Sequence, residues 1–194
     1  MPKTFRVVIL ASTRGTDFSA MLEEKNAGKL KGVEFVGLVS NKPCLAAEKA
    51  EAANIPTFVL DAKSKDFQDK LLATVKELQP DLICLVGYMR ILREDFCKAF
   101  ENKILNIHPS LLPKYAGGMD LNVYEEVLKN KETETGMSIH LVTPVVDGGA
   151  IICQKSVAIA DGETPESLKE KVQQLEKKWY PEVIRWFRDG KIYF

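Results

Sequence analysis

The residues best suited to chemistry lie in the run 106–113, which reads Asn-Ile-His-Pro-Ser-Leu-Leu-Pro. The apolar residues around Asn106 indicate the end of a strand, in which every second side chain points to the same face. Asn106 and His108 should therefore point the same way, about 7 Å apart along the chain. Pro109 lacks a backbone donor and favours an extended His108, which places the pair at the rim of a sheet. Two polar side chains satisfied at a turn have the same spacing, so the spacing alone leaves both interpretations open.

Asp147 is followed by two glycines, and an Asp-Gly pair is typical of tight hairpin turns. The functional alternative is a carboxylate held at the rim beside His108. A carboxylate within about 4–6 Å would raise the pKa of the imidazole and keep it protonated near neutral pH. His140 alternates with Ile139 and Leu141 in a strand-like run, so we expect it to be a structural, hydrogen-bonded sheet residue.

Strands and helices alternate regularly in the first two-thirds of the chain. This alternation predicts an α/β fold with a doubly wound, mostly parallel sheet. The expected strands are 6–11, 33–40, 57–60, 81–86 and 103–108, and the expected helices are 16–29, 44–53, 65–78 and 93–100. A helix over 121–129, a β-hairpin formed by 138–142 and 150–154 around the Asp-Gly signal, and a long final helix over 165–188 follow.

Ligands of doubly wound sheets bind at the carboxyl ends of the strands, near the point where the strand order reverses. Three irregular connections, 12–15, 87–92 and 106–113, should meet at this edge. In the first of them, Gly15 precedes a helix whose N-terminus favours an anion such as phosphate. A plain strand-to-helix turn capped by Thr16 or Asp17 explains the same residues equally well.

Length and composition exclude several classes of protein. The 194 residues fit one domain, and 27 basic against 27 acidic residues give no net charge, which argues against nucleic acid or an anionic membrane as a partner. We find no secretory signal and no apolar stretch long enough to span a bilayer. The four scattered cysteines indicate reduced core thiols in a cytoplasmic protein. With two histidines in the chain, no metal site is expected.

The runs 87–92 (Gly-Tyr-Met-Arg-Ile-Leu), 106–115 and 147–149 (Asp-Gly-Gly) together resemble the folate-dependent formyltransferases, above all the branch that acts on phosphoribosylglycinamide. The resemblance covers nearly the whole chain. It implies a Rossmann-like formyltransferase fold and transfer of a formyl group from the co-substrate 10-formyltetrahydrofolate to an amine in purine biosynthesis, without a metal. It further implies small-molecule partners and a monomer or homodimer. Within the single domain 1–194, residues 1–100 would bind the phosphate-bearing substrate, and 101–194 would supply the catalytic and folate-binding half.

The resemblance also implies roles for individual residues. Asn106 would donate to the oxyanion that forms when the amine attacks, a contact worth roughly 2.7–4 kcal/mol. Protonated His108 would stabilise the same charge and shuttle a proton, and Asp147 would raise its pKa. The binding residues implied are Gly15, Thr16 and Asp17 for the phosphate, with help from Lys65; Glu176 for the ribose; and Lys65, Met89, Arg90, Ile91, Leu92 and Asn106 for the folate. By itself, Arg90 could equally be an ordinary surface arginine.

The sequence departs from the family pattern at two places. The first loop usually reads Ser-Gly-x-Gly-Ser-Asn, whereas here it reads Ser-Thr-Arg-Gly-Thr-Asp over 12–17, so Asp17 puts a carboxylate where a phosphate is expected. The stretch 116–124 is longer than usual and ends at Tyr124, where the family commonly has a histidine; its two glycines predict mobility. These departures bear on which amine is the substrate more than on the formyl transfer reaction itself.

Two alternatives follow for the function. One is formyl transfer to another amine, such as an amino sugar nucleotide, and the other is a catalytically silent ligand-binding module. Formyltransferases that act on methionyl-tRNA carry an additional C-terminal domain and a basic surface, which this neutral chain does not show. Formyltetrahydrofolate hydrolases usually carry an additional N-terminal domain, and we expect none before Phe5.

Overall fold

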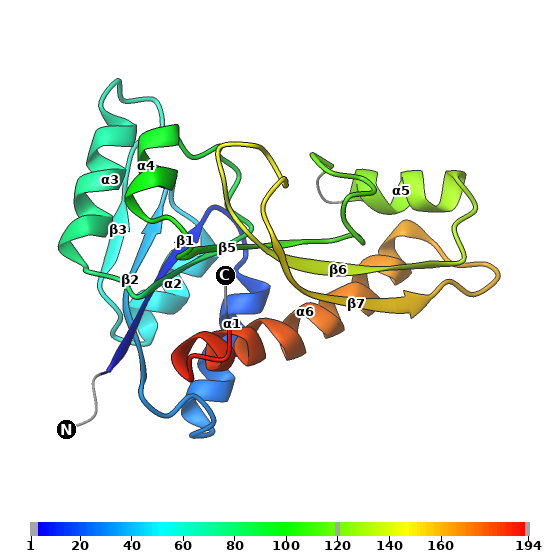
Figure 1. The fold of residues 1–194 in the computed structure, drawn as a ribbon, viewed down its shortest axis with the longest axis horizontal. Helices are drawn as coiled ribbons and strands as arrows, with labels where there is room; N and C mark the ends of the chain where they lie inside the picture. Colours follow the sequence, from blue (N-terminus) through cyan, green and yellow to red (C-terminus); the bar gives the residue numbers. More distant parts are fainter. Residues whose placement is uncertain (1–3, 119–120, 193–194) are drawn as a thin grey trace.

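The computed structural model describes residues 4–118 and 121–192. Seven strands and six helices form in the described part of the chain (Figure 1). The strands are β1 (Phe5–Ala11), β2 (Val33–Ser40), β3 (Thr57–Val59), β4 (Leu82–Val86), β5 (Ile104–His108), β6 (Glu134–Leu141) and β7 (Ile151–Ala158). The helices are α1 (Thr16–Asn26), α2 (Leu45–Ala52), α3 (Phe67–Glu77), α4 (Glu94–Ala99), α5 (Leu121–Lys129) and α6 (Pro165–Arg188).

The strands form a single sheet with the order β3-β2-β1-β4-β5-β6-β7. The first five strands in this sheet are parallel, and β6 and β7 are antiparallel to their neighbours. The chain moves outward from β1 to β2 and β3, then returns to the other side of β1 with β4. The strand order therefore reverses between β1 and β4, as a doubly wound sheet requires. The predicted fold class is confirmed.

Helices cover both faces of the parallel strands, and β1 shows why. Val7 and Ile9 belong to the core under α1, α2, α5 and α6, whereas Val8 and Leu10 belong to the core under α3 and α4. All four side chains are fully buried. A strand buried on both faces needs a continuous apolar run, because successive side chains point to opposite sides.

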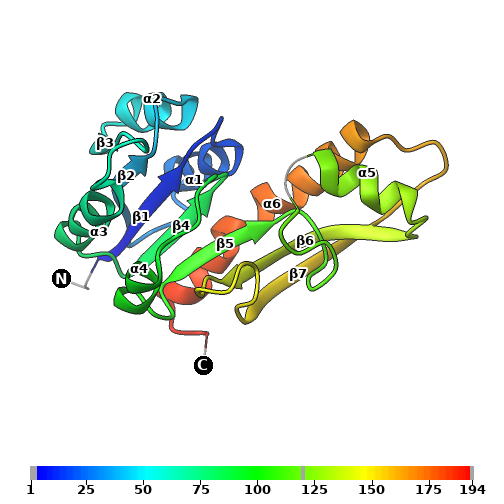
Figure 2. The ribbon, with the colours of Figure 1, turned by 90° about the horizontal axis from the view of Figure 1, so that it is seen from above.

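Helix α6 connects the two parts of the sheet. It begins with Pro165 after an N-cap at Thr164, whose hydroxyl accepts from the Ser167 backbone N–H, while the Ser167 hydroxyl accepts from the Thr164 N–H. The helix packs against α1, α5, β6 and β7, and Figure 2 shows it running from the parallel strands toward the far end of the β6–β7 hairpin. One side of α6 can therefore face a crevice along the sheet edge.

Most element boundaries match the prediction within three residues, but the hairpin differs. Strand β6 begins at Glu134, four residues before the predicted start, because 134–137 pair with 155–158 of β7. The connection between the two strands is no tight Asp-Gly turn. The Leu141 N–H donates to the Ala150 carbonyl, and the residues between them form a longer loop.

Three further observations concern the described residues. No described helix is long and apolar enough to cross a membrane. In the same residues, no group of three or more His, Cys, Asp or Glu side chains could hold a metal ion. All four cysteines are free; Cys84, Cys97 and Cys153 are buried, while Cys44 is half-buried before α2.

Candidate active site

A crevice of about 930 Å³ lies at the carboxyl ends of β1, β4 and β5, where the strand order reverses. It receives the loops after all three strands, the 142–150 connection and one side of α6. All but two of the predicted site residues line it. Those that do are Thr16, Asp17, Met89, Arg90, Ile91, Leu92, Asn106, His108, Asp147 and Glu176.

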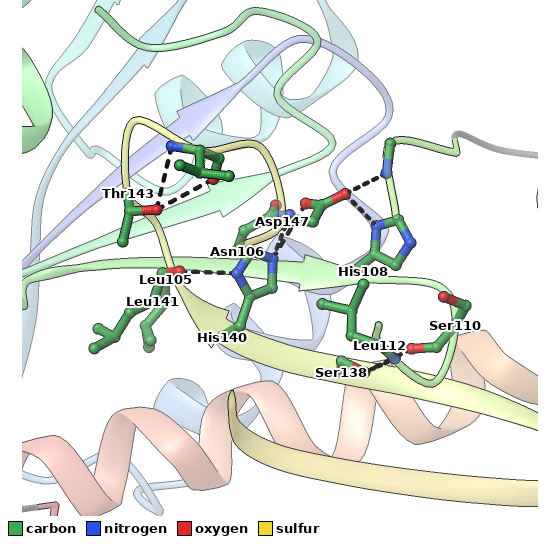
Figure 3. A network of polar contacts seen from close by, with 12 residues as sticks. Leu105, Asn106, His108, Ser110, Leu112, Ser138, His140, Leu141, Thr143 and Asp147 are labelled. Atoms are coloured by element: carbon green, nitrogen blue, oxygen red, sulfur yellow. Dashed lines mark hydrogen bonds and ion pairs between the residues drawn. The ribbon is translucent and has the colours of Figure 1, made fainter. Parts of the chain in front are cut away.

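The end of β5 presents Asn106 and His108 to the crevice, and both reach toward Asp147 (Figure 3). His108 is almost fully buried, at 3% exposed. Its Nδ1 atom lies 3.3 Å from Oδ2 of Asp147. The prediction that the three side chains meet at the sheet rim is confirmed, because strand alternation puts Asn106 and His108 on one face.

Asp147 reaches His108 because the 142–150 connection folds over the sheet end. Asp147 itself has a left-handed backbone with φ 51°, a conformation that Asp tolerates better than most residues. A Cβ atom at Gly149 would lie 1.8 Å from the Leu141 carbonyl oxygen, so only glycine fits there. Gly149 is therefore required because the backbone passes close to Leu141, and not because the chain makes a two-residue turn. This close approach positions the Asp147 carboxylate.

Protonation of His108 differs from the prediction. Burial lowers the pKa of His108 below its ordinary value of 6.5, and this outweighs the Asp147 carboxylate, which favours the charged form. Burial therefore works against the protonated ring that the prediction assumed. A hydrogen bond from His140 in its protonated form, the Gly117 N–H and the charge of protonated His108 lower the pKa of Asp147 to about 2.

His140 also lines the crevice, a position that sequence reasoning did not assign to it. Strands β5 and β6 pair Asn106 with His140, and the Asn106 Nδ2 atom lies 3.1 Å from His140 Nε2. His140 Nδ1 lies 2.8 Å from the Leu141 carbonyl oxygen, which only accepts, so Nδ1 carries the proton and Nε2 accepts from Asn106. The same Nε2 atom lies 3.4 Å from Oδ1 of Asp147. His140 is a hydrogen-bonded sheet residue, as predicted, but one that fixes the Asn106 amide.

The loop that follows His108 is fixed from two directions. The Ser138 hydroxyl donates to the Ser110 carbonyl (2.6 Å) and accepts from the Leu112 N–H (3.0 Å). His108 Nε2 donates to the Tyr115 carbonyl oxygen at 2.9 Å. The predicted mobile stretch 116–124 lies partly outside the described residues, at 119–120, and Gly117 donates its N–H to Oδ2 of Asp147 at 2.8 Å.

The start of α1 and one side of α6 line another part of the crevice. Gly15 has φ 65°, and a Cβ there would lie 2.7 Å from the Ala46 Cβ, so the turn into α1 requires glycine. Gly15 itself does not line the crevice, in contrast to Thr16 and Asp17. Glu176 of α6 is 8% exposed, and burial, reinforced by the charge of Asp17, raises its pKa to about 8.

Comparison with known proteins gives the family. The formyl transferase family profile matches residues 5–184. The chain belongs to the formyl transferase family. The phosphoribosylglycinamide formyltransferase of Escherichia coli (strain K12) is 34% identical over 190 residues, which cover 96% of this chain and 88% of that protein. The trifunctional purine biosynthetic protein adenosine-3 of Bos taurus is 36% identical over 98% of this chain, which spans 19% of that protein.

Solved structures of formyl transferases agree with the sequence comparison. The phosphoribosylglycinamide formyltransferase of Coxiella burnetii has a TM-score of 0.91 at 37% identity, covering 99% of this chain and 90% of that one. The glycinamide ribonucleotide transformylase 1 of Symbiobacterium toebii also has a TM-score of 0.91, at 32% identity, covering 100% of this chain and 92% of that one.

One predicted folate-binding residue of this formyl transferase lies elsewhere. Lys65 is exposed in the turn before α3 and does not line the crevice. It follows β3, the edge strand of the sheet, whereas the crevice lies at the ends of β1, β4 and β5. The apolar candidates are better placed: Met89 and Ile91 line the crevice with exposed side chains, as do Val145 and Val146 of the 142–150 connection.

Proposed function

We propose that this formyl transferase moves the formyl group of 10-formyltetrahydrofolate to the amino group of phosphoribosylglycinamide, a step of purine biosynthesis in the cytoplasm. The observation that carries the proposal is the meeting of Asn106, His108 and Asp147 at the switch-point crevice. The relatives named for this activity match nearly the whole chain and support the choice of substrate.

The reaction requires charge stabilisation and a proton transfer. When the amine nitrogen bonds to the formyl carbon, the carbonyl oxygen gains a negative charge and the nitrogen a positive one. One Asn106 N–H is bonded to His140, and its second N–H remains to donate to the oxyanion. The amine proton must then reach the folate nitrogen as the bond between that nitrogen and the formyl carbon breaks.

Asp147 and His108 are the groups that could move this proton. Asp147 is ionised at neutral pH, and burial lowers the pKa of His108, which favours the form of the ring that can accept a proton. Because the Nε2–H of His108 is engaged by the Tyr115 carbonyl, it must exchange that contact before it donates to a substrate atom. Both groups belong to this chain, so no metal is needed in this scheme.

The crevice divides the two substrates between its ends. In this proposal, Met89–Leu92 and the 142–150 connection hold the folate, and the start of α1 with Glu176 faces the phosphoribosyl part of the acceptor. Residues 1–100 supply most of the phosphate end and 101–194 the catalytic residues, with Met89–Leu92 crossing that division. We propose small-molecule partners alone, and a monomer or a homodimer.

The test is formyl transfer by the purified protein. Incubation with 10-formyltetrahydrofolate and phosphoribosylglycinamide should consume the formyl donor and yield the formylated amine, and the Asn106→Ala variant should lose this activity. The departure from the family pattern at Asp17 favours one second candidate, transfer to a different amine such as an amino sugar nucleotide. Turnover with that acceptor alone would select this candidate, and folate binding without any turnover would leave a silent binding module.

A further inference from the structure

The start of α1 lies in the substrate end of the crevice and carries an unusual charge. The first N–H groups of a helix lack intrahelical partners and attract anions. Gly15, the N-cap, supplies no side-chain hydrogen bond to them, and the helix is 11 residues long. In many proteins such a terminus binds a phosphate directly. Here the first turn already contains a carboxylate, that of Asp17.

Asp17 is buried and incompletely bonded. Its side chain lines the crevice, yet the residue is only 7% exposed. The Oδ1 atom is fully buried and has no hydrogen-bond partner among the described residues. An unpartnered buried acceptor is costly, and a bound group that donates a hydrogen bond to it would remove that cost. The residue therefore points to a bound group that donates a hydrogen bond.

The carboxylate of Asp17 itself disfavours a phosphate. Glu176, across the crevice on α6, is buried and close enough for its charge to interact with that of Asp17. Lys177 and Lys169 partly offset these two carboxyls, and Arg14 lines the crevice at the turn. Because the pKa of Glu176 is raised to about 8, Asp17 is the carboxylate that a phosphate dianion would meet here, whereas a neutral sugar hydroxyl could donate to it.

We propose that Asp17 is a specificity-determining residue, a built-in anion at the start of α1 that accepts a hydrogen bond from a sugar hydroxyl of the substrate. As a result, the substrate's phosphate contributes little to binding. This inference rests on the proposed function, because it takes the acceptor to be a phosphorylated ribosyl amine. In this inference, the Asp17 carboxylate supplies the negative charge that a bound phosphate supplies at other helix N-termini.

The test compares phosphoribosylglycinamide with its dephosphorylated form as formyl acceptors. Wild-type protein should show similar KM values for the two. The Asp17→Asn variant keeps the side-chain shape and a hydrogen-bond acceptor but removes the charge, so its KM for the phosphorylated acceptor should fall roughly tenfold. Its KM for the dephosphorylated acceptor should stay within about twofold of the wild-type value. The matched control is Glu170→Gln, which removes an exposed carboxylate from the same crevice and should change neither KM by more than about twofold.

Inorganic phosphate gives a readout that does not depend on turnover. Titrated calorimetrically into each protein, it should bind roughly tenfold more tightly to Asp17→Asn than to wild type. If wild type transfers formyl to neither acceptor, the proposed function fails, while phosphate binding still tests the role of Asp17. Equal KM changes for both acceptors, or phosphate affinity unaltered by Asp17→Asn, would overturn the inference. Thermal unfolding of the variant verifies the fold, and Asp17→Ser serves if the Asn variant unfolds.

Discussion

The Nε2 atom of His140 accepts a hydrogen bond from the Asn106 amide at 3.1 Å, across the antiparallel pairing of β5 and β6. Because His140 Nδ1 donates to the Leu141 carbonyl, the ring is held in one tautomer and one orientation. The amide nitrogen of Asn106, not its oxygen, is therefore fixed toward His140. The position of the second Asn106 N–H follows from this contact, and so does its use as an oxyanion donor.

Replacing His140 should lower turnover through Asn106. His140→Phe keeps a ring but removes the acceptor, and loss of one hydrogen bond of about 0.5–1.5 kcal/mol should lower kcat up to about tenfold with little change in KM. His140→Gln restores an acceptor and should recover most of the rate. Steady-state kinetics measure both. In an Asn106→Ala background the two variants should have equal rates, and a further loss there would show that His140 acts independently of Asn106.

Asp147→Asn should lower kcat by about a hundredfold or more, because the charged carboxylate that assists proton transfer is lost. The pKa of about 2 means that Asp147 is ionised at every pH used for assay. Asparagine keeps an oxygen that can accept from the Gly117 N–H, so the fold should persist, as circular dichroism can show. Near-normal turnover of a folded variant would refute the role given to Asp147.

His108 should titrate below pH 6.5, because burial disfavours the imidazolium more than Asp147 favours it. NMR of the histidine ring protons measures this directly, and with two histidines in the chain, His140→Gln assigns the signals. Asp147→Asn removes a charge that favours the protonated ring, so the midpoint should move to still lower pH. A midpoint at or above 6.5 would instead support the protonated His108 expected from sequence.

The sequence was sufficient for the parallel half of the fold and for placing Asn106 and His108 together at the sheet rim. Buried strands such as β1 are continuous apolar runs, and the alternation of side chains fixed the shared face of Asn106 and His108. Asp147 was identified by resemblance, but the 142–150 connection that delivers it was taken for a tight turn. In a sequence, a glycine required by a close backbone approach cannot be distinguished from a glycine required by a turn. The close contact of Gly149 with the Leu141 carbonyl, seen in the structure, makes the distinction.

Properties that depend on tertiary contacts could not be predicted. The pairing of His140 with Asn106 depends on the register between β5 and β6, which local patterns do not encode. The pKa of His108 depends on how deeply the ring is buried, so the sign of its shift was wrong. Lys65 was assigned to the site although strand β3, which it follows, lies at the sheet edge away from the crevice.

The hydroxyl of Tyr180, on α6, stabilises the strand ends that present the site. The residue is completely buried, and its oxygen lies 3.0 Å from the Leu85 carbonyl oxygen of β4 and 3.1 Å from that of Leu105 in β5. Tyr180→Phe leaves these buried carbonyls without that donor and should lower the free energy of unfolding by about 1–3 kcal/mol. Tyr88→Phe is the matched control, because the buried Tyr88 hydroxyl has no partner among the described residues, and its loss should be neutral or stabilising. Urea denaturation of the two variants gives both values. Equal destabilisation would mean that the lost hydroxyl acts through packing alone and that the bridge between β4 and β5 contributes nothing.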